Sequence, residues 1–189
     1  MLRIFYELEV QPLKLRNIVL CAQFAALMCI SAWISVPVQD MSFTLQTLVL
    51  FLSLGLLGGK RGSMVCLVYL LLGAAGLPVF SGFRGGIGAL FGATGGYIAG
   101  FLAAALLYWA ITGIFGNSFA VRLTALSAGL LACYTLGTIW FAAVYLHSGS
   151  PMGFGAMLMK CVVPYLLPDA VKLTLALLLT AKLKPLLPQ

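Results

Sequence analysis

The sequence predicts an all-α integral membrane protein with six transmembrane helices and both termini in the cytoplasm. Three observations predict this class. Of the 189 residues 62% are hydrophobic, only 8% are charged, and long apolar segments separate the charges. An ordinary soluble domain carries about 25% charged residues, so this chain lacks the composition of a water-facing surface. The mean hydropathy of +1.11 agrees.

The six expected helices follow from the apolar segments and their limits. A helix that crosses a bilayer needs about 17 to 25 mostly apolar residues, and several segments without Asp, Glu, Lys or Arg are that long. The first segment is long enough to span, which favours a retained helix over a cleaved signal peptide. We expect a cytoplasmic amino-terminal segment, 1–16, and a six-helix membrane domain, 17–189. The expected spans are 17–36, 43–59, 62–79, 89–115, 123–146 and 164–181.

The basic residues set the expected topology. They mark alternate ends of the spans, at Lys14, Arg16, Lys60, Arg61, Arg122, Lys182 and Lys184. Asp40, Arg84 and His147 mark the other ends. Because cytoplasmic loops carry the Lys and Arg excess, both termini are expected inside the cell, in a multi-pass protein of the cell membrane.

The outer connections are expected at about 37–42, 80–88 and 147–163. The third is rich in Gly and Ser, which favours a mobile lid followed by a short interfacial helix. The last helix is expected to begin near Pro164, because proline is tolerated in a first turn.

Small residues recur at helical spacing in two places. Gly88, Gly92, Gly96 and Gly100 repeat every fourth residue, a pattern that lets helix backbones approach closely in lipid. Ala22, Ala25 and Ala26 form a similar stripe on the first span. The spacing leaves open whether this stripe meets its own bundle or another subunit.

The strongest functional signal is a pair of charges inside the last span. Asp169 and Lys172 are three residues apart, which places them on one helix face. A charge at the bilayer centre costs about 2.5 to 3.5 kcal/mol on insertion scales, so such residues usually face a bundle interior or a wet cavity. The alternative is that Asp169 and Lys172 only neutralise each other and stabilise the bundle, without binding a ligand. Asp169 lies about five residues below the expected outer end, or roughly 8 Å at 1.5 Å per residue, so a site there would open outward.

Other candidates to line this site lie near the same membrane face. They are Thr44, Gln46, Phe80, Arg84 and Tyr97. For each of them helix capping or interfacial anchoring is an equal alternative. Lys160 is expected to extend to the outer interface, and His147 is expected to be a solvated residue.

Several function classes lack the residues they require. The five cysteines are scattered and include no C-x-x-C pair, so neither a disulfide framework nor a metal site is expected. The Gly-Gly-Lys60-Arg61 turn lacks the spacing of a phosphate loop. Only four acidic residues are present, the nucleophile elbow G-x-S-x-G is absent, and the basic residues are not clustered as in nucleic-acid-binding proteins. We expect a binding protein without enzymatic activity, metal or cofactor.

Four motifs carry a resemblance to a known family. They are Thr44-Leu-Gln46-Thr-Leu, Gly76-Leu-Pro-Val-Phe-Ser-Gly82, Gly92-Ala-Thr-Gly-Gly-Tyr-Ile-Ala-Gly-Phe101 and Pro168-Asp-Ala-Val-Lys172. In order and spacing, from about residue 17 to the end, the chain resembles the BioY family of biotin-transporter substrate-capture subunits. One departure is Ala93, where the family commonly has proline.

The resemblance implies the substrate-capture (S) component of an energy-coupling factor (ECF) transporter. It implies six helices that bind biotin near the outer face, and partners consisting of a membrane coupling subunit and two ATPases. Asp169 and Lys172 would then meet the polar groups of biotin, with Arg84, Gln46, Thr44, Phe80 and Tyr97 completing the site. Ala22, Ala25 and Ala26 would form the docking face for the coupling subunit.

Two other function classes stay open at this stage. A self-sufficient channel or facilitator for a small solute would use Asp169 and Lys172 to line a path instead of a closed pocket. An intramembrane enzyme would need a nucleophile and a base at the same depth, and the sequence supplies no such set.

Overall fold

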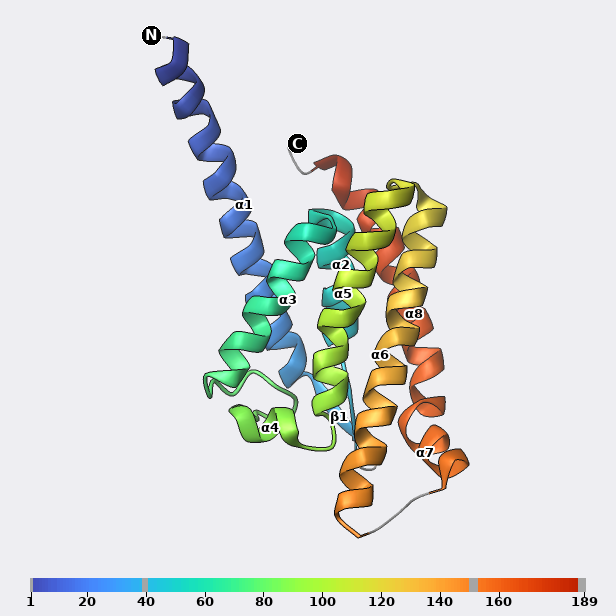
Figure 1. Cartoon of the computed structure of the whole chain (residues 1–189). Helices are drawn as coiled ribbons and strands as arrows, with labels where there is room; N and C mark the ends of the chain where they lie inside the picture. Colours follow the sequence, from blue (N-terminus) through green and yellow to red (C-terminus); the bar gives the residue numbers. More distant parts are fainter. Residues whose placement is uncertain (1, 39–40, 150–152, 187–189) are drawn as a thin grey trace.

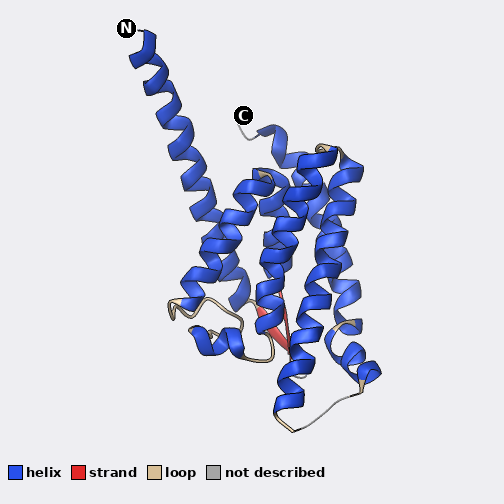
Figure 2. Cartoon of the chain, viewed as in Figure 1, coloured by secondary structure: helices blue, strands red, loops and turns tan. Residues whose placement is uncertain are grey.

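The computed structural model describes residues 2–38, 41–149 and 153–186, and most of them are helical (Figure 2). The helices and strands follow in this order: α1 Leu2–Trp33, β1 Ser35–Val38, β2 Met41–Thr44, α2 Gln46–Leu57, α3 Gly59–Ala74, α4 Ile87–Phe91, α5 Gly95–Phe115, α6 Phe119–His147, α7 Phe154–Cys161, α8 Val163–Leu183 and the 3₁₀ turn η1 Lys184–Leu186.

Six helices, α1, α2, α3, α5, α6 and α8, form a bundle (Figure 1). α5 packs along α6, and α2 contacts both α3 and α8. The chain ends and the α2–α3 and α5–α6 connections lie at one end of the bundle, while α4, the β1–β2 hairpin and α7 lie at the other. All the predicted outer connections therefore come together at one end.

Four stretches are long and apolar enough to cross a membrane: Leu15–Trp33, Gly95–Phe115, Phe119–His147 and Phe154–Leu186. The helices over the second and third predicted spans are shorter, with 12 residues in α2 and 16 in α3. At 1.5 Å per residue they extend about 18 and 24 Å, less than the roughly 30 Å of a hydrocarbon core. A bundle helix thus overlaps each of the six predicted segments, at unequal lengths.

The sequence predicts a cytoplasmic amino-terminal segment, 1–16, before the first span. In the structure α1 runs without a break from Leu2 to Trp33. Residues 2–16 are therefore helical and continue the axis of the first span.

The predicted helix over 89–115 begins too early. The chain turns sharply between α4 and α5, where a Cβ added to Gly95 would lie 1.6 Å from the Leu90 carbonyl oxygen. Gly88 and Gly92 therefore lie outside α5, and their predicted place on one continuous glycine face is wrong. Gly96 and Gly100 do pack closely on α6, since a Cβ at Gly96 would lie 2.2 Å from Trp140 Cβ and one at Gly100 would lie 2.9 Å from Cys133 Sγ.

A β-hairpin occupies the first predicted outer connection. β1 pairs with β2 antiparallel, with Ser35 opposite Thr44. Thr44 thus ends a strand and does not lie in the predicted helix 43–59. Asp40, predicted to mark this membrane face, lies outside the described residues.

The third outer connection contains the predicted short helix, α7. α8 begins at Val163 with Pro164 in its first turn, as predicted. Pro168 lies inside α8, where it cannot donate a hydrogen bond to the carbonyl of residue 164. The predicted lid includes residues 150–152, which lie outside the described residues.

The bundle core is aromatic and aliphatic, with Phe51, Tyr69, Tyr108 and Phe141 among its largest buried side chains. Many leucines and isoleucines on the outer faces are exposed, as expected for helices surrounded by lipid. Among the described residues, Asp169 and Lys172 are the buried charged side chains. Their predicted place in the bundle interior is confirmed.

Candidate ligand-binding site

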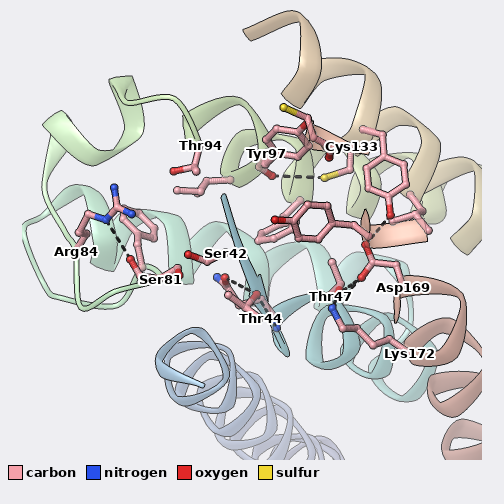
Figure 3. A pocket seen from close by; sticks show the side chains of 18 of the residues that line it. Ser42, Thr44, Thr47, Ser81, Arg84, Thr94, Tyr97, Cys133, Asp169 and Lys172 are labelled. Atoms are coloured by element: carbon pink, nitrogen blue, oxygen red, sulfur yellow. Dashed lines mark hydrogen bonds and ion pairs between the residues drawn. The ribbon is translucent and has the colours of Figure 1, made fainter. Parts of the chain in front are cut away.

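A cavity lies at the end of the bundle that holds the hairpin, α4 and α7 (Figure 3). It is built by residues from the hairpin, from α2, α4, α5, α6, α7 and α8, and from the loops on either side of α4. Its walls are Ser42, Thr44, Gln46, Thr47, Phe80, Ser81, Arg84, Ala89, Thr94, Tyr97, Ile98, Phe101, Leu130, Cys133, Tyr134, Cys161, Tyr165, Asp169 and Lys172.

One side of the cavity is formed by an ion pair. Lys172 Nζ lies 2.8 Å from Asp169 Oδ1, and both side chains are 6% exposed. Thr47 joins the pair, because its hydroxyl donates to Asp169 Oδ1 at 3.0 Å and accepts from Lys172 Nζ at 3.1 Å. Removing two charges from water is costly unless they are paired and hydrogen-bonded, and this triangle meets that requirement.

A third donor reaches the same carboxylate from another helix. The Tyr134 hydroxyl donates to Asp169 Oδ2 at 2.6 Å. Asp169 therefore accepts hydrogen bonds from α2, α6 and its own helix, and each of its oxygens is engaged. The carboxylate is held in one orientation before any ligand enters.

Phe43 covers the ammonium group on another side. Lys172 Nζ lies 4.0 Å from the centroid of the Phe43 ring, within the range of a cation–π interaction. Phe43 also lines a shallow groove outside the cavity together with Val36, Pro164, Tyr165 and Pro168. The hairpin thus places an aromatic ring between the ion pair and the outer surface of the bundle.

A second polar chain runs from the hairpin to α3. The Thr44 hydroxyl donates to Gln46 Oε1 at 3.0 Å, and Gln46 Nε2 donates to the Tyr69 hydroxyl. Tyr69 in turn donates to the Val79 carbonyl at 3.0 Å. This chain fixes the Gln46 amide and connects it to the loop between α3 and α4.

Arg84 lies at the other side of the cavity from the ion pair (Figure 3). Its side chain is exposed, and its Nε donates to the Ser81 carbonyl at 3.3 Å. The Ser81 carbonyl carries no charge, so this hydrogen bond does not neutralise the Arg84 guanidinium. The cavity therefore has a buried, neutralised polar end and a cationic mouth.

The wall between these ends is largely apolar. Phe80 is 2% exposed and meets the Tyr69 ring edge-on, with centroids 5.6 Å apart. The Tyr97 hydroxyl lies 2.9 Å from Thr138 Oγ1, so its polar atom is paired within the protein. A ligand with polar ends and an apolar middle matches this distribution of groups.

The seven predicted site residues come together here: Asp169, Lys172, Arg84, Gln46, Thr44, Phe80 and Tyr97 all line the cavity. Two important members were not predicted, Thr47 and Tyr134. Each is a polar side chain inside an apolar helix, and that is the signal that would have found them. Lys160, which we expected at the interface, lies with its Nζ 5.7 Å from the Tyr145 ring centroid, and His147 is exposed at the end of α6.

The predicted docking stripe is divided by the structure. Ala22 and Ala26 are exposed on α1, whereas Ala25 is 3% exposed and belongs to the bundle core. Ala25 therefore does not lie on the exposed face with the other two, since its side chain packs inside this chain.

These features define a class: a multi-pass helical membrane protein with a partly enclosed ligand cavity near one end of its bundle. The sequence profile of the BioY family matches residues 7–189. The chain belongs to the BioY family.

Two relatives match over almost their full lengths. The biotin transporter BioY of Thermotoga maritima is 38% identical over 91% of this chain and 98% of its own length. The probable biotin transporter BioY of Pyrococcus horikoshii is 37% identical, also over 91% and 98%.

A solved structure shares the fold. The crystal structure of the S-component for biotin from an ECF-type ABC transporter superposes with a TM-score of 0.81 and 22% sequence identity, covering 92% of this chain and 93% of the other.

Proposed function

We propose that this chain is the biotin-binding subunit of a vitamin uptake transporter. It captures biotin from the outer face and delivers it inward together with an energy-coupling module, composed of a transmembrane coupling subunit and two ATPases. Family membership and the names of the relatives support the substrate. The observation that carries the site is the buried Asp169–Lys172 pair in a cavity with an apolar wall and a separate cationic mouth.

The chemistry of biotin fits the two ends of the cavity. Its ureido ring has two N–H donors and a carbonyl acceptor, its bicycle is apolar, and its chain ends in a carboxylate. A ureido N–H can donate to Asp169, and Lys172 can donate to the ureido carbonyl. Hydrogen bonds to charged groups are roughly twice as strong as neutral ones, so this end discriminates the ring.

The carboxylate of biotin belongs at the other end, near Arg84. Beside Lys172 it would face the negative charge of Asp169, which lies 2.8 Å from the same ammonium group. Arg84 offers a positive charge whose described hydrogen bond goes to a neutral carbonyl. Phe80 and Tyr97 then enclose the apolar body. In this orientation the ureido ring enters first and lies deepest.

The topology of this proposal has six spans with both termini in the cytoplasm. Support comes from the placement of both chain ends with the α2–α3 and α5–α6 connections (Figure 1), because these regions hold Lys60, Arg61 and Arg122. The short α2 and α3 are the second and third spans, and residues 17–189 form the membrane domain that follows the cytoplasmic segment 1–16. The cavity then opens outward.

The coupling subunit is proposed to dock on α1. Ala22 and Ala26 lie one turn apart and are exposed, so they leave a smooth face on which another helix can pack closely.

Isothermal titration of biotin into detergent-purified protein tests the substrate and the site. Wild type is expected to release heat with one site per chain, and Asp169→Asn and Lys172→Ala are expected to weaken binding at least tenfold. Lys182→Ala on the same helix is the matched control, because Lys182 is exposed and lies outside the cavity. Absence of heat from wild type removes the biotin assignment, and unchanged affinity in both cavity variants removes the site.

A transport assay separates this proposal from a self-sufficient facilitator. Purified chain reconstituted alone in liposomes is expected to bind labelled biotin without moving it into the lumen. Entry of biotin into the lumen through the chain alone would support the facilitator.

A further inference from the structure

Trp33, the last residue of α1, is in contact with a loop far away in the sequence. Its indole N–H donates to the Pro78 carbonyl at 2.7 Å. Its ring stacks on Phe83, with centroids 5.4 Å apart and planes inclined by 20°. Both partners belong to the loop between α3 and α4, so one side chain of α1 holds this loop at two points.

This loop, residues 75–86, carries the mouth of the cavity. Phe80, Ser81 and Arg84 all line the cavity from it. We refer to it as the mouth loop. Contacts that hold the mouth loop in place therefore also position the side chains that would face a ligand at the entrance.

The inner side of the mouth loop is held by the bundle. The buried Phe80 ring fills the space beside Gly73, where an added Cβ would lie 2.0 Å from Phe80 Cζ. The Tyr69 hydroxyl donates to Val79, and the Gly86 N–H donates to the Gly73 carbonyl at 2.7 Å. These contacts hold Val79, Phe80 and Gly86 against the bundle, whereas Pro78 and Phe83, which Trp33 contacts, are exposed and form the outer part of the loop.

Phe83 shows why the outer part needs such a support. Its φ is +57°, the left-handed region that a non-glycine residue rarely adopts. Such a conformation persists when surrounding contacts hold it, and the Phe83 ring is itself 63% exposed. The stacking with Trp33 is therefore a contact that stabilises this conformation, and Arg84 is the next residue in the chain.

We propose that Trp33 is a positioning residue for the cavity mouth: by holding Pro78 and Phe83 it fixes the position of the neighbouring Arg84. This inference depends on the proposed function only because its binding test uses biotin as the ligand. A mouth held in place slows the escape of a bound ligand, so Trp33 acts on the dissociation rate more than on the association rate.

Two variants separate the two contacts. Trp33→Phe keeps an aromatic ring for Phe83 but removes the N–H donor, and Trp33→Leu removes both. Trp109→Leu is the matched control, because Trp109 is 43% exposed, similar to the 40% of Trp33, and lies in the half of α5 away from the cavity. Dissociation of labelled biotin is measured after a chase with unlabelled biotin.

The expected rates differ between the variants. Trp33→Phe is expected to raise the dissociation rate roughly threefold to tenfold, the range that loss of one neutral hydrogen bond gives. Trp33→Leu is expected to raise it further, while the association rate changes less than about twofold, because mutants of one binding site differ mostly in their dissociation rates. Trp109→Leu is expected to match wild type. Wild-type dissociation rates in both Trp33 variants would overturn the proposal.

A measurement without ligand makes the inference independent of biotin. In hydrogen exchange, the Phe80 amide, which donates to the Arg84 carbonyl within the mouth loop, is expected to exchange faster in Trp33→Leu than in Trp109→Leu. Equal exchange would refute the positioning role even if biotin binds. Faster exchange in a protein that does not bind biotin would support this role while the proposed function fails.

Discussion

Tyr134 on α6 donates a 2.6 Å hydrogen bond to Asp169 on α8 and thereby joins two helices across the cavity. The same carboxylate accepts from Thr47 and Lys172. Its orientation therefore depends on three elements of the bundle at once. A carboxylate that is preorganised in this way gives up little freedom when a ligand binds.

Replacing Tyr134 by Phe removes this donor without changing the shape of the ring. Asp169 keeps Thr47 and Lys172 but loses the contact that fixes Oδ2. We expect biotin affinity measured by isothermal titration to fall about tenfold, which corresponds to about 1.4 kcal/mol. Tyr108→Phe is the control, since the Tyr108 hydroxyl is buried, has no hydrogen-bond partner in the described structure and lies outside the cavity. Equal affinity of the two variants would mean that Tyr134 does not orient the carboxylate.

Phe43 is predicted to support the ion pair from the hairpin. In Phe43→Leu the ring that lies 4.0 Å from Lys172 Nζ is lost, and a desolvated cation–π interaction is worth about 2 kcal/mol. We expect weaker biotin binding, by about tenfold or more, because the ammonium group gains freedom. Phe154→Leu on α7 is the matched control, since that ring is exposed. A loss of affinity shared by both variants would point to a general effect of aromatic removal at this membrane face.

The ion pair was predictable from the sequence, whereas its surroundings were not. Asp169 and Lys172 are recognisable because charges are rare inside apolar segments and their spacing places them on one face. Thr47 and Tyr134 lie 122 and 35 residues from Asp169, and their approach to it is a consequence of tertiary packing. A polar residue inside an apolar helix indicates an interior contact without identifying the partner.

The boundaries of the helices and strands were likewise only partly predictable from the sequence. Gly88, Gly92, Gly96 and Gly100 have the spacing of one helix face, but the chain turns between α4, which ends at Phe91, and α5, which begins at Gly95. The β1–β2 hairpin was missed because its strands have only four residues each. Such short strands leave too few positions for an alternating pattern to be recognised.

Two glycines of α5 are predicted to respond in opposite ways to replacement by alanine. A Cβ at Gly96 would lie 2.2 Å from Trp140 Cβ, whereas one at Gly113 has nothing within 4 Å. Gly96→Ala is expected to separate α5 from α6 and to lower stability by about 1 to 3 kcal/mol, the usual cost of overpacking. Gly113→Ala is expected to be neutral or to stabilise by up to about 1 kcal/mol. Thermal unfolding in detergent tests this pair, and similar midpoints would contradict the close packing of α5 on α6.

Docking on α1 is predicted to be separable from substrate binding. Ala22 and Ala26 are exposed on α1, whereas their neighbour Ala25 packs in the core. In Ala26→Trp the large ring blocks close packing of a partner helix while the cavity, which contains no residue of α1, stays unchanged. We expect uptake in cells that contain the coupling module to be lost while biotin affinity of the purified chain is kept.

Leu131→Trp on the exposed face of α6 is the control for an added ring and is expected to preserve uptake. Because the two measurements use the same variant, lost binding in Ala26→Trp would show that α1 acts on the cavity itself, and retained uptake would place the partner on another face.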